Sequence, residues 1–135
     1  MSKENHEISA AVATCMDFRF QKLIADWIEE RSLYGDHDRI AVAGAAGDRD
    51  ALLSQIKLSI KLHGTKGVHI INHQNCGKYG NSLVSGSRAE LEKHTSDISE
   101  IKEIITHEYP EVTVLGYFAT LDEDGKANSI NPVEI

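Results

Sequence analysis

The sequence predicts an α/β fold of three layers, in which helices cover both faces of a mainly parallel central sheet. Short apolar segments typical of buried strands alternate with segments whose apolar residues recur at helical spacing. Strands separated by helices in this way pair in parallel through right-handed crossovers. Near the end of the chain, the turn sequence Asp124-Gly125 predicts a return antiparallel strand. We expect four parallel strands in the order 2-1-3-4, with the antiparallel strand added to them.

The predicted strands are short, apolar and bounded by polar or glycine-containing segments. The first, EISAAVATC, ends on a cysteine, and the third, GVHIINH, ends on a histidine. In order along the chain, we expect strands over residues 7–15, 40–43, 67–73 and 112–118, and a hairpin return over 119–130.

Three amphipathic helices are predicted between these strands. Residues 20–32 carry apolar side chains at positions i, i+3, i+4, i+7 and i+8, which form one helix face. Residues 48–64 form a second helix with Gly64 as its stop, and residues 86–110 a long polar helix that ends before Pro110. The residues of this third helix that we expect to face inward are Leu91, Ile98, Ile101, Ile104 and Ile105.

Length and charge limit the classes of protein to which the chain could belong. Its 135 residues fit a single domain, residues 1–135, with a core of its own. The net charge of −7 argues against a nucleic-acid partner, because such proteins present a basic face. No apolar run is long enough to span a membrane, and the polar start has no signal-peptide pattern. We therefore expect a cytoplasmic protein.

The chemistry-bearing residues follow the first and third predicted strands. The segment CMDFR places Cys15, Asp17 and Arg19 at two-residue spacing, and HQNCG places His73 three residues before Cys76. Parallel strands present their carboxyl ends at one edge of the sheet, and ligands bind there where the strand order reverses. Two cysteines in a cytosolic chain favour a metal site or catalysis over a disulfide. The sequence predicts a zinc site formed by Cys15, His73 and Cys76.

The fourth coordination position has two alternative occupants at this stage. Three protein ligands leave one position open, as in catalytic zinc sites, whereas structural sites have four protein ligands. Asp17 can bind the metal and close the site. Alternatively, Asp17 can pair with Arg19 and leave room for a water, whose pKa the metal lowers to about 7.

These motifs resemble those of the β-class carbonic anhydrases. CMDFR matches the Cys-x-Asp-x-Arg signature of that family, and HQNCG matches its His-x-x-Cys-Gly signature. The predicted order of elements is also similar over nearly the whole chain. The resemblance implies that Cys15, His73 and Cys76 bind Zn²⁺. It implies that Asp17 and Arg19 form a dyad that orients a zinc-bound hydroxide, which hydrates carbon dioxide reversibly to bicarbonate. The resemblance also implies a homodimer or a multiple of dimers.

The chain departs from the family pattern in two ways. Many members carry Arg-Asn-Ala-Gly after the second strand, whereas Ala43 and Gly44 stand at the arginine and asparagine positions here. The chain is also shorter than most members and lacks a long N-terminal helical arm. Two alternatives therefore remain open. One is a carbonyl sulfide or carbon disulfide hydrolase on the same scaffold. The other is a catalytically silent zinc-binding protein with Asp17 as fourth ligand.

The remaining histidines are given structural interpretations. His69 shares the parity of His73 on the third strand, and we expect it to be a core histidine rather than a ligand. For most of the others, we expect exposure to solvent; they are His6, His37, His63, His94 and His107.

Overall fold

A five-stranded mixed sheet lies at the centre of the computed structural model, which describes residues 6–135. The strands lie in the order β2-β1-β3-β4-β5; all neighbours pair in parallel except β5, which runs antiparallel to β4. The strands are β1 (Ala10–Thr14), β2 (His37–Ala41), β3 (Gly67–His73), β4 (Thr113–Leu121) and β5 (Ala127–Val133). The predicted strand order and the antiparallel final strand are confirmed.

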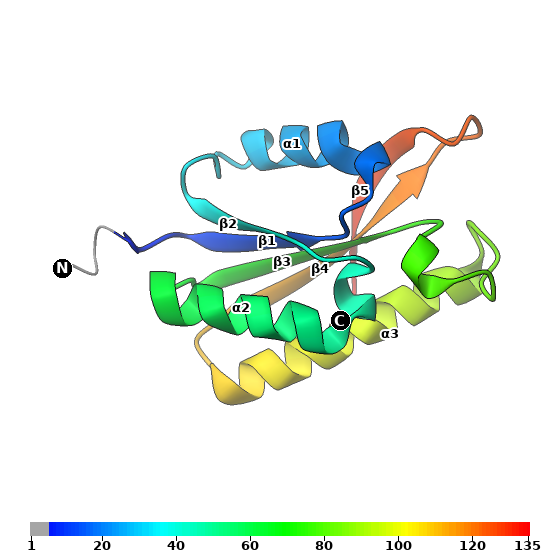
Figure 1. Cartoon of the computed structure of the whole chain (residues 1–135). Coiled ribbons are helices and arrows are strands. Elements are labelled where there is room, and N and C mark those ends of the chain that lie inside the picture. The colour runs from blue at the N-terminus through cyan, green and yellow to red at the C-terminus, as the bar shows by residue number, and fades with distance from the viewer. Residues whose placement is uncertain (1–5) are drawn as a thin grey trace.

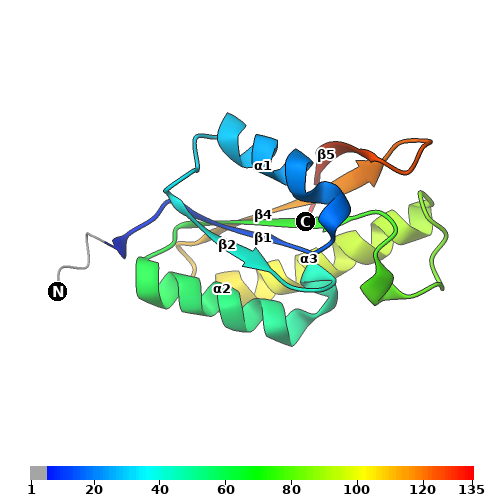
Figure 2. The ribbon, with the colours of Figure 1, turned by 45° about the horizontal axis from the view of Figure 1, so that its top comes forward.

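Helices cover both faces of this sheet, which confirms the three predicted layers. Helix α1 packs on one face, and α2 and α3 lie on the other (Figure 1). The same layers are visible after a 45° turn (Figure 2). The helices are α1 (Gln21–Glu30), α2 (Arg49–His63) and α3 (Arg88–Glu108). Gly64 ends α2 in the left-handed conformation, as predicted.

Each face of the sheet has its own apolar core. Residues alternate between the two faces along a strand, so β1 contributes Ala11 and Ala13 to one core and Ala10 and Val12 to the other. The core under α2 and α3 includes Leu52, Ile56, Val68, Ile70, Ile98, Ile101 and Ile105. The core under α1 includes Phe20, Ile24, Trp27, Ile28, Ile71 and Tyr117.

The second strand begins and ends earlier than predicted. The apolar run Ile40–Ala43 suggested a strand there, but β2 comprises His37–Ala41, and within it Ile40 alone is buried. The reason is its place at the edge of the sheet, where β1 is its one neighbouring strand. An edge strand is partly exposed, so its sequence need not be apolar.

The inward face of α3 also differs from the prediction near its start. Ile98, Ile101 and Ile105 are fully buried, but Leu91 is 39% exposed and Ile104 is partly exposed. The buried residues of the first turns are instead polar, namely Glu90 and His94. These two precede Ile98 by eight and four residues, so they continue the same helix face toward the ends of the strands.

The parallel pairing of β1 with β3 brings the predicted site together. Thr14, the last residue of β1, pairs with Ile71, two residues before the end of β3. Cys15 therefore follows β1 at the same edge of the sheet at which β3 ends. Asn72 and His73, the last residues of β3, lie on the neighbouring strand. This register is what joins two motifs that are far apart in the sequence.

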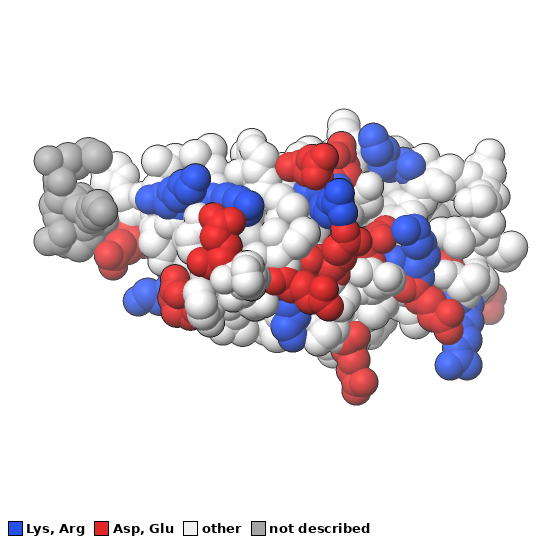
Figure 3. All heavy atoms as spheres, turned by 90° about the horizontal axis from the view of Figure 1, so that it is seen from below, with Lys and Arg blue, Asp and Glu red and all other residues white. Residues whose placement is uncertain are grey.

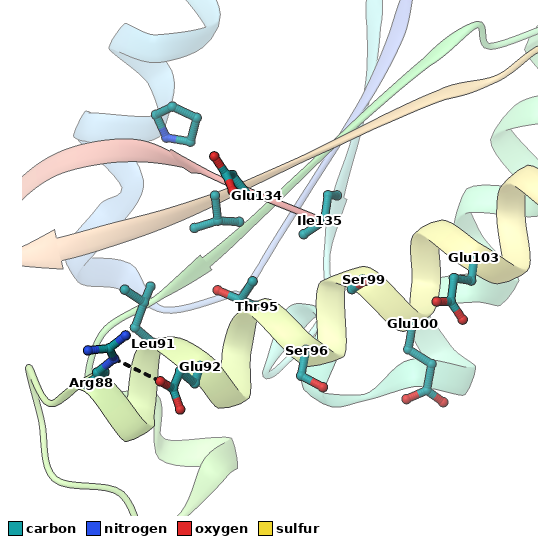
Figure 4. Close-up of a pocket in the computed structure, with 12 residues that line it drawn as sticks. Arg88, Leu91, Glu92, Thr95, Ser96, Ser99, Glu100, Glu103, Glu134 and Ile135 are labelled. Atoms are coloured by element: carbon teal, nitrogen blue, oxygen red, sulfur yellow. Dashed lines mark hydrogen bonds and ion pairs between the residues drawn. The ribbon is translucent and has the colours of Figure 1, made fainter.

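A broad surface hollow lies elsewhere, between α3 and the end of β5. It has a volume of about 930 Å³ and is lined by residues that include Leu91, Thr95, Ser99 and Ile135 (Figure 4). On the face formed by α2 and α3, acidic and basic side chains are interspersed (Figure 3). Among the ion pairs of these helices are Arg49–Glu100 and Lys57–Glu108. None of the helices within residues 6–135 carries an apolar stretch long enough to cross a bilayer.

Gly116 provides a test of the packing between α3 and β4. A methyl group at this position would lie 2.8 Å from Cγ2 of Ile98 and 3.2 Å from side-chain atoms of Val133 and Ile135. We expect Gly116→Ala to lower the free energy of unfolding by about 1–3 kcal/mol, because the core has no space for the added group. Urea unfolding followed by circular dichroism measures the change.

Gly67→Ala is the matched control for this substitution. Gly67 begins the neighbouring strand β3, and an added methyl group there would make an ordinary contact of 3.6 Å with the Ser9 carbonyl oxygen. We expect its destabilisation to be clearly smaller. Equal losses in the two variants would contradict the tight packing of α3 against β4.

Candidate metal centre

Three buried side chains bring metal-ligating atoms together at the carboxyl edge of the sheet. The Sγ atoms of Cys15 and Cys76 and a ring nitrogen of His73 all lie within 4.8 Å of one another. The two Sγ atoms are 4.0 Å apart. The residues are 9%, 5% and 3% exposed, respectively. Two thiols and an imidazole in this arrangement could hold a metal ion, as the sequence motifs predicted.

Local backbone structure places each of the three donors. Cys15 directly follows β1, and His73 is the last residue of β3. Cys76 precedes the short 3₁₀ helix η4 (Gly77–Tyr79). The turn between His73 and Cys76 contains Asn75 in the left-handed conformation, with φ of 60°. The backbone reverses direction at this turn, so the donor atoms of His73 and Cys76 lie close together.

His73 is oriented as a ligand for a metal would be. Its Nδ1 lies 2.7 Å from the carbonyl oxygen of Gln74, which can accept but not donate, so Nδ1 carries the proton. Its Nε2 is buried and finds no hydrogen-bond partner among residues 6–135. In a neutral imidazole with a protonated Nδ1, Nε2 presents a free lone pair. Metal-binding histidines commonly donate their other nitrogen to a carbonyl in this way.

The two thiols have opposite tendencies to ionise. The hydrogen bond with Cys76, together with the one donated by the backbone N–H of Gly44, lowers the pKa of Cys15 below the ordinary thiol value. The Gly44 nitrogen is 3.3 Å from Sγ of Cys15. The hydrogen bond with Cys15 and burial both raise the pKa of Cys76. The pair therefore shares one proton, which a bound cation would displace.

Asp17 and Arg19 form a two-pronged ion pair beside these donors. Nη2 of Arg19 donates to Oδ2 of Asp17 at 2.7 Å, and Nε donates to Oδ1 at 3.0 Å. The Arg19 hydrogen bonds lower the pKa of Asp17 below its ordinary value, so the carboxylate is ionised at neutral pH. Oδ2 of Asp17 lies 3.8 Å from Nε2 of His73. The Asp17 carboxylate thus lies at the edge of the donor cluster while Arg19 binds it.

A buried polar network behind the donors was not predicted from the sequence. Nδ2 of Asn72 lies 3.0 Å from the Tyr79 hydroxyl and 2.9 Å from Nδ1 of His94, and the Tyr79 hydroxyl donates to Asp97 at 2.7 Å. The rings of Tyr79 and His94 stack with centroids 3.8 Å apart. His94 is therefore an exception among the histidines that we expected to be mostly exposed, because His94 is 1% exposed. The helical spacing of Glu90, His94 and Ile98 was the signal in the sequence that could have revealed it.

His69 has the structural role predicted for it. Its Nδ1 lies 2.9 Å from the Tyr117 hydroxyl, and the Trp27 ring packs edge-on against it with centroids 5.1 Å apart. Burial lowers the pKa of His69, which keeps the ring neutral. Its hydrogen bond and its packing in the α1 core give a sufficient reason for a histidine at this position.

Metal content tests the donor cluster directly. We expect the purified protein to bind about one divalent metal ion per chain. Cys15→Ser and His73→Ala should each lower the affinity at least about tenfold, because each removes one of three donors. Elemental analysis after dialysis, with chelator competition for the affinities, gives the measurement. His107→Ala, at an exposed position of α3, is the control, and metal loss in that variant equal to the loss in His73→Ala would contradict the site.

Comparison with known proteins agrees with the fold and with the motifs. A family model described as "Putative carbonic anhydrase" matches residues 5–131. An uncharacterized protein of Rickettsia bellii is 25% identical over 142 residues, covering 90% of this chain and 85% of that protein. An uncharacterized protein of Rickettsia conorii is 22% identical and covers 89% of this chain and 72% of its own length.

Solved structures of similar fold include a carbonic anhydrase and a carbon disulfide hydrolase. The carbonic anhydrase from Streptococcus mutans superimposes with a TM-score of 0.63 and 15% identity, covering 95% of this chain and 84% of that one. The carbon disulfide hydrolase, in its apo form, gives a TM-score of 0.58 and 18% identity, covering 98% and 84%. At these identities the likeness concerns the fold. The family model spans nearly the whole chain, and the chain therefore belongs to this carbonic anhydrase family.

Proposed function

We propose that this protein is a zinc-dependent carbonic anhydrase that hydrates carbon dioxide reversibly to bicarbonate. The observation that carries the proposal is the buried Cys15–His73–Cys76 cluster, with the free Nε2 of His73 and the Arg19-bound carboxylate of Asp17 beside it. Two thiolates and an imidazole are a donor set that Zn²⁺ prefers. Three protein ligands leave one coordination position for a reactant, which is the arrangement of catalytic zinc sites.

Each residue of the site has a role in this reaction. Bound zinc supplies a Lewis acid that polarises the reactants and lowers the pKa of water to about 7. Cys15, His73 and Cys76 hold the ion. The ionised Asp17 can only accept hydrogen bonds, so it orients a hydroxyl group with its lone pair toward the carbon of the substrate. Arg19 keeps the carboxylate in that orientation and prevents it from filling the open position.

The proposed assembly is a homodimer or a multiple of dimers in which a second copy covers the mouth of the site. Met16 and Phe18 flank Asp17 and are 67% and 77% exposed, and apolar side chains exposed next to one another favour an interface. Burial of both side chains by a partner would exclude water from the carboxylate between them. The free thiols of Cys15 and Cys76 fit a reducing compartment, and we propose the cytoplasm.

Carbon dioxide hydration provides the direct test. We expect the zinc-loaded protein to hydrate carbon dioxide in a stopped-flow assay with a pH indicator. Asp17→Asn should lower kcat/KM by about 100-fold or more, because the amide can donate a hydrogen bond where an acceptor is needed. Asp26→Asn is the matched control, since Asp26 forms an exposed ion pair with Lys22 on α1.

Parallel assays separate the alternatives. Zinc-loaded protein can be assayed for release of sulfide from carbon disulfide or carbonyl sulfide. Release of sulfide without hydration of carbon dioxide would favour a hydrolase instead, in keeping with the similar fold of a carbon disulfide hydrolase. Protein that turns over none of these substrates, and loses zinc on Asp17→Asn, would be the silent form with Asp17 as fourth ligand.

The ionisation of Asp17 does not set the pH dependence of the proposed reaction near neutrality. Arg19 lowers the pKa of Asp17, so this carboxylate is already ionised well below neutrality and adds no titration there. Zinc held by Cys15, His73 and Cys76 would lower the pKa of water to about 7, so activity should be low in mildly acidic solution and rise with pH through and above neutrality. Initial rates of hydration between about pH 6 and pH 9 measure this, and a flat profile would contradict the mechanism.

A further inference from the structure

A buried carboxylate, Glu90, joins the start of α3 to the turn that carries the metal donors. Glu90 is 3% exposed. Its Oε2 accepts the backbone N–H of Asn75 at 2.7 Å, and its Oε1 accepts the backbone N–H of Gly86 at 2.9 Å. Hydrogen bonds from backbone N–H groups to a carboxylate are among the stronger ones in proteins. Glu90 therefore ties the His73–Cys76 turn to the long helix α3.

Capping of α3 does not account for the hydrogen bonds that the Glu90 carboxylate accepts. Ser87 and Glu90 have the spacing of a capping box, in which the glutamate accepts the backbone N–H of the cap residue. Half of that box is present, because the Ser87 hydroxyl accepts the N–H of Glu90 at 3.1 Å. The N–H of Ser87, however, donates to the Val84 carbonyl oxygen at 3.0 Å. The Glu90 carboxylate thus leaves the Ser87 N–H to Val84 and binds Gly86, just before the cap, and Asn75 in the His73–Cys76 turn.

Asn75 is bound on both sides. It is one of three non-glycine residues with positive φ among those described, a conformation that asparagine tolerates better than most residues. Glu90 accepts its N–H, whereas Arg19 donates to its other two polar groups. Nη2 of Arg19 lies 2.8 Å from the Asn75 carbonyl oxygen, and Nη1 lies 3.0 Å from Oδ1.

Arg19 links this turn to the Asp17 carboxylate. Its Nε and Nη2 bind Asp17, and its Nη1 and Nη2 bind Asn75, so one rigid guanidinium spans both partners. The planar fork of an arginine cannot adjust to one partner without moving relative to the other. The orientation of Asp17 therefore depends on the position of Asn75, and the position of Asn75 depends on Glu90.

We propose that Glu90 is a positioning residue for the Asp17–Arg19 pair, acting through the left-handed turn at Asn75. The carboxylate fixes Asn75, Asn75 fixes the guanidinium of Arg19, and Arg19 fixes Asp17 beside the donor cluster. Glu90 touches neither substrate nor metal. Its effect on catalysis rests on the proposed carbonic anhydrase activity, whereas its effect on the geometry of Arg19 does not.

Glu90→Gln in the metal-free protein tests the geometry. The amide side chain offers one acceptor and presents NH₂ to the second N–H, so one of the two backbone contacts is lost. We expect the Asn75 amide and the Arg19 Nε–H to exchange with solvent at least about tenfold faster in ¹H–¹⁵N spectra, relative to the Ile101 amide in the core. Unchanged exchange at both groups would overturn the proposal.

Ser87→Ala is the matched control at the same helix turn. It removes the cap of α3 and leaves both contacts of the Glu90 carboxylate in place. We expect the Asn75 and Arg19 exchange rates, again relative to Ile101, to stay at wild-type values. Acceleration as large as in Glu90→Gln would show that fraying of the helix, and not the carboxylate, controls the turn, and would overturn the proposal.

Zinc-loaded protein tests the catalytic consequence separately. Glu90→Gln should lower kcat for hydration about tenfold, with KM and the zinc content of about one per chain unchanged, because the donors remain and the Asp17 orientation is lost. Glu90→Asp, which retains the charge, should recover part of the rate. Normal kcat in Glu90→Gln would overturn the positioning role. Absence of hydration in the wild-type protein would instead refute the proposed function and leave the exchange test valid.

A second variant keeps the proposal testable if Glu90→Gln does not fold. Asn75→Gly accepts the positive φ and retains both backbone contacts, so it removes the Oδ1 acceptor of Arg19 and little else. We expect faster exchange of the Arg19 Nε–H with normal exchange at Ile101. Wild-type exchange of the Arg19 Nε–H in this variant would contradict the dependence of Arg19 on Asn75.

Discussion

The parallel pairing of β1 with β3 is the constraint on which the rest of the site depends. The register that sets Thr14 beside Ile71 brings Cys15 to the end of the strand that finishes on His73. A one-residue slip would send each side chain to the opposite face of the sheet and separate the donors. Both strands are central and buried, so the apolar cores on the two faces enforce this register. The packing of the cores therefore also sets the geometry of the Cys15–His73–Cys76 donor cluster.

Charged side chains gather at the carboxyl edge of the sheet, and the partly buried guanidinium of Arg19 connects them. A guanidinium with five donors in a fixed plane can serve Asp17 and Asn75 together, which a lysine could not do with comparable geometry. The turn that supplies His73 and Cys76 is thereby connected to the loop that supplies Cys15. Glu90 adds a third segment, the start of α3, to the same assembly. Three separate parts of the chain thus determine one carboxylate orientation.

The predictions for the start of α3 and for β2 were both wrong because each depends on contacts with distant parts of the chain. Apolar periodicity locates a core face well where packing is the sole requirement, as for Ile98, Ile101 and Ile105. It failed at the start of α3, where Glu90 and His94 are buried because partners elsewhere in the chain satisfy their polar atoms. It also misplaced β2, whose edge position lets polar residues form the strand. Neither circumstance is visible in a local window of sequence.

The sequence by itself predicted the alternation of strands and helices, because apolar periodicity is a local property, and its two short motifs named five candidate site residues. The tertiary structure decided how those residues are arranged. It brought Cys15, His73 and Cys76 within 4.8 Å of one another, and it placed Asp17 on Arg19. It also brought the Glu90 carboxylate into contact with Asn75, in the turn between His73 and Cys76. These outcomes depend on contacts between segments far apart in the chain, and such contacts exist only once the sheet register and the packing of α3 are set.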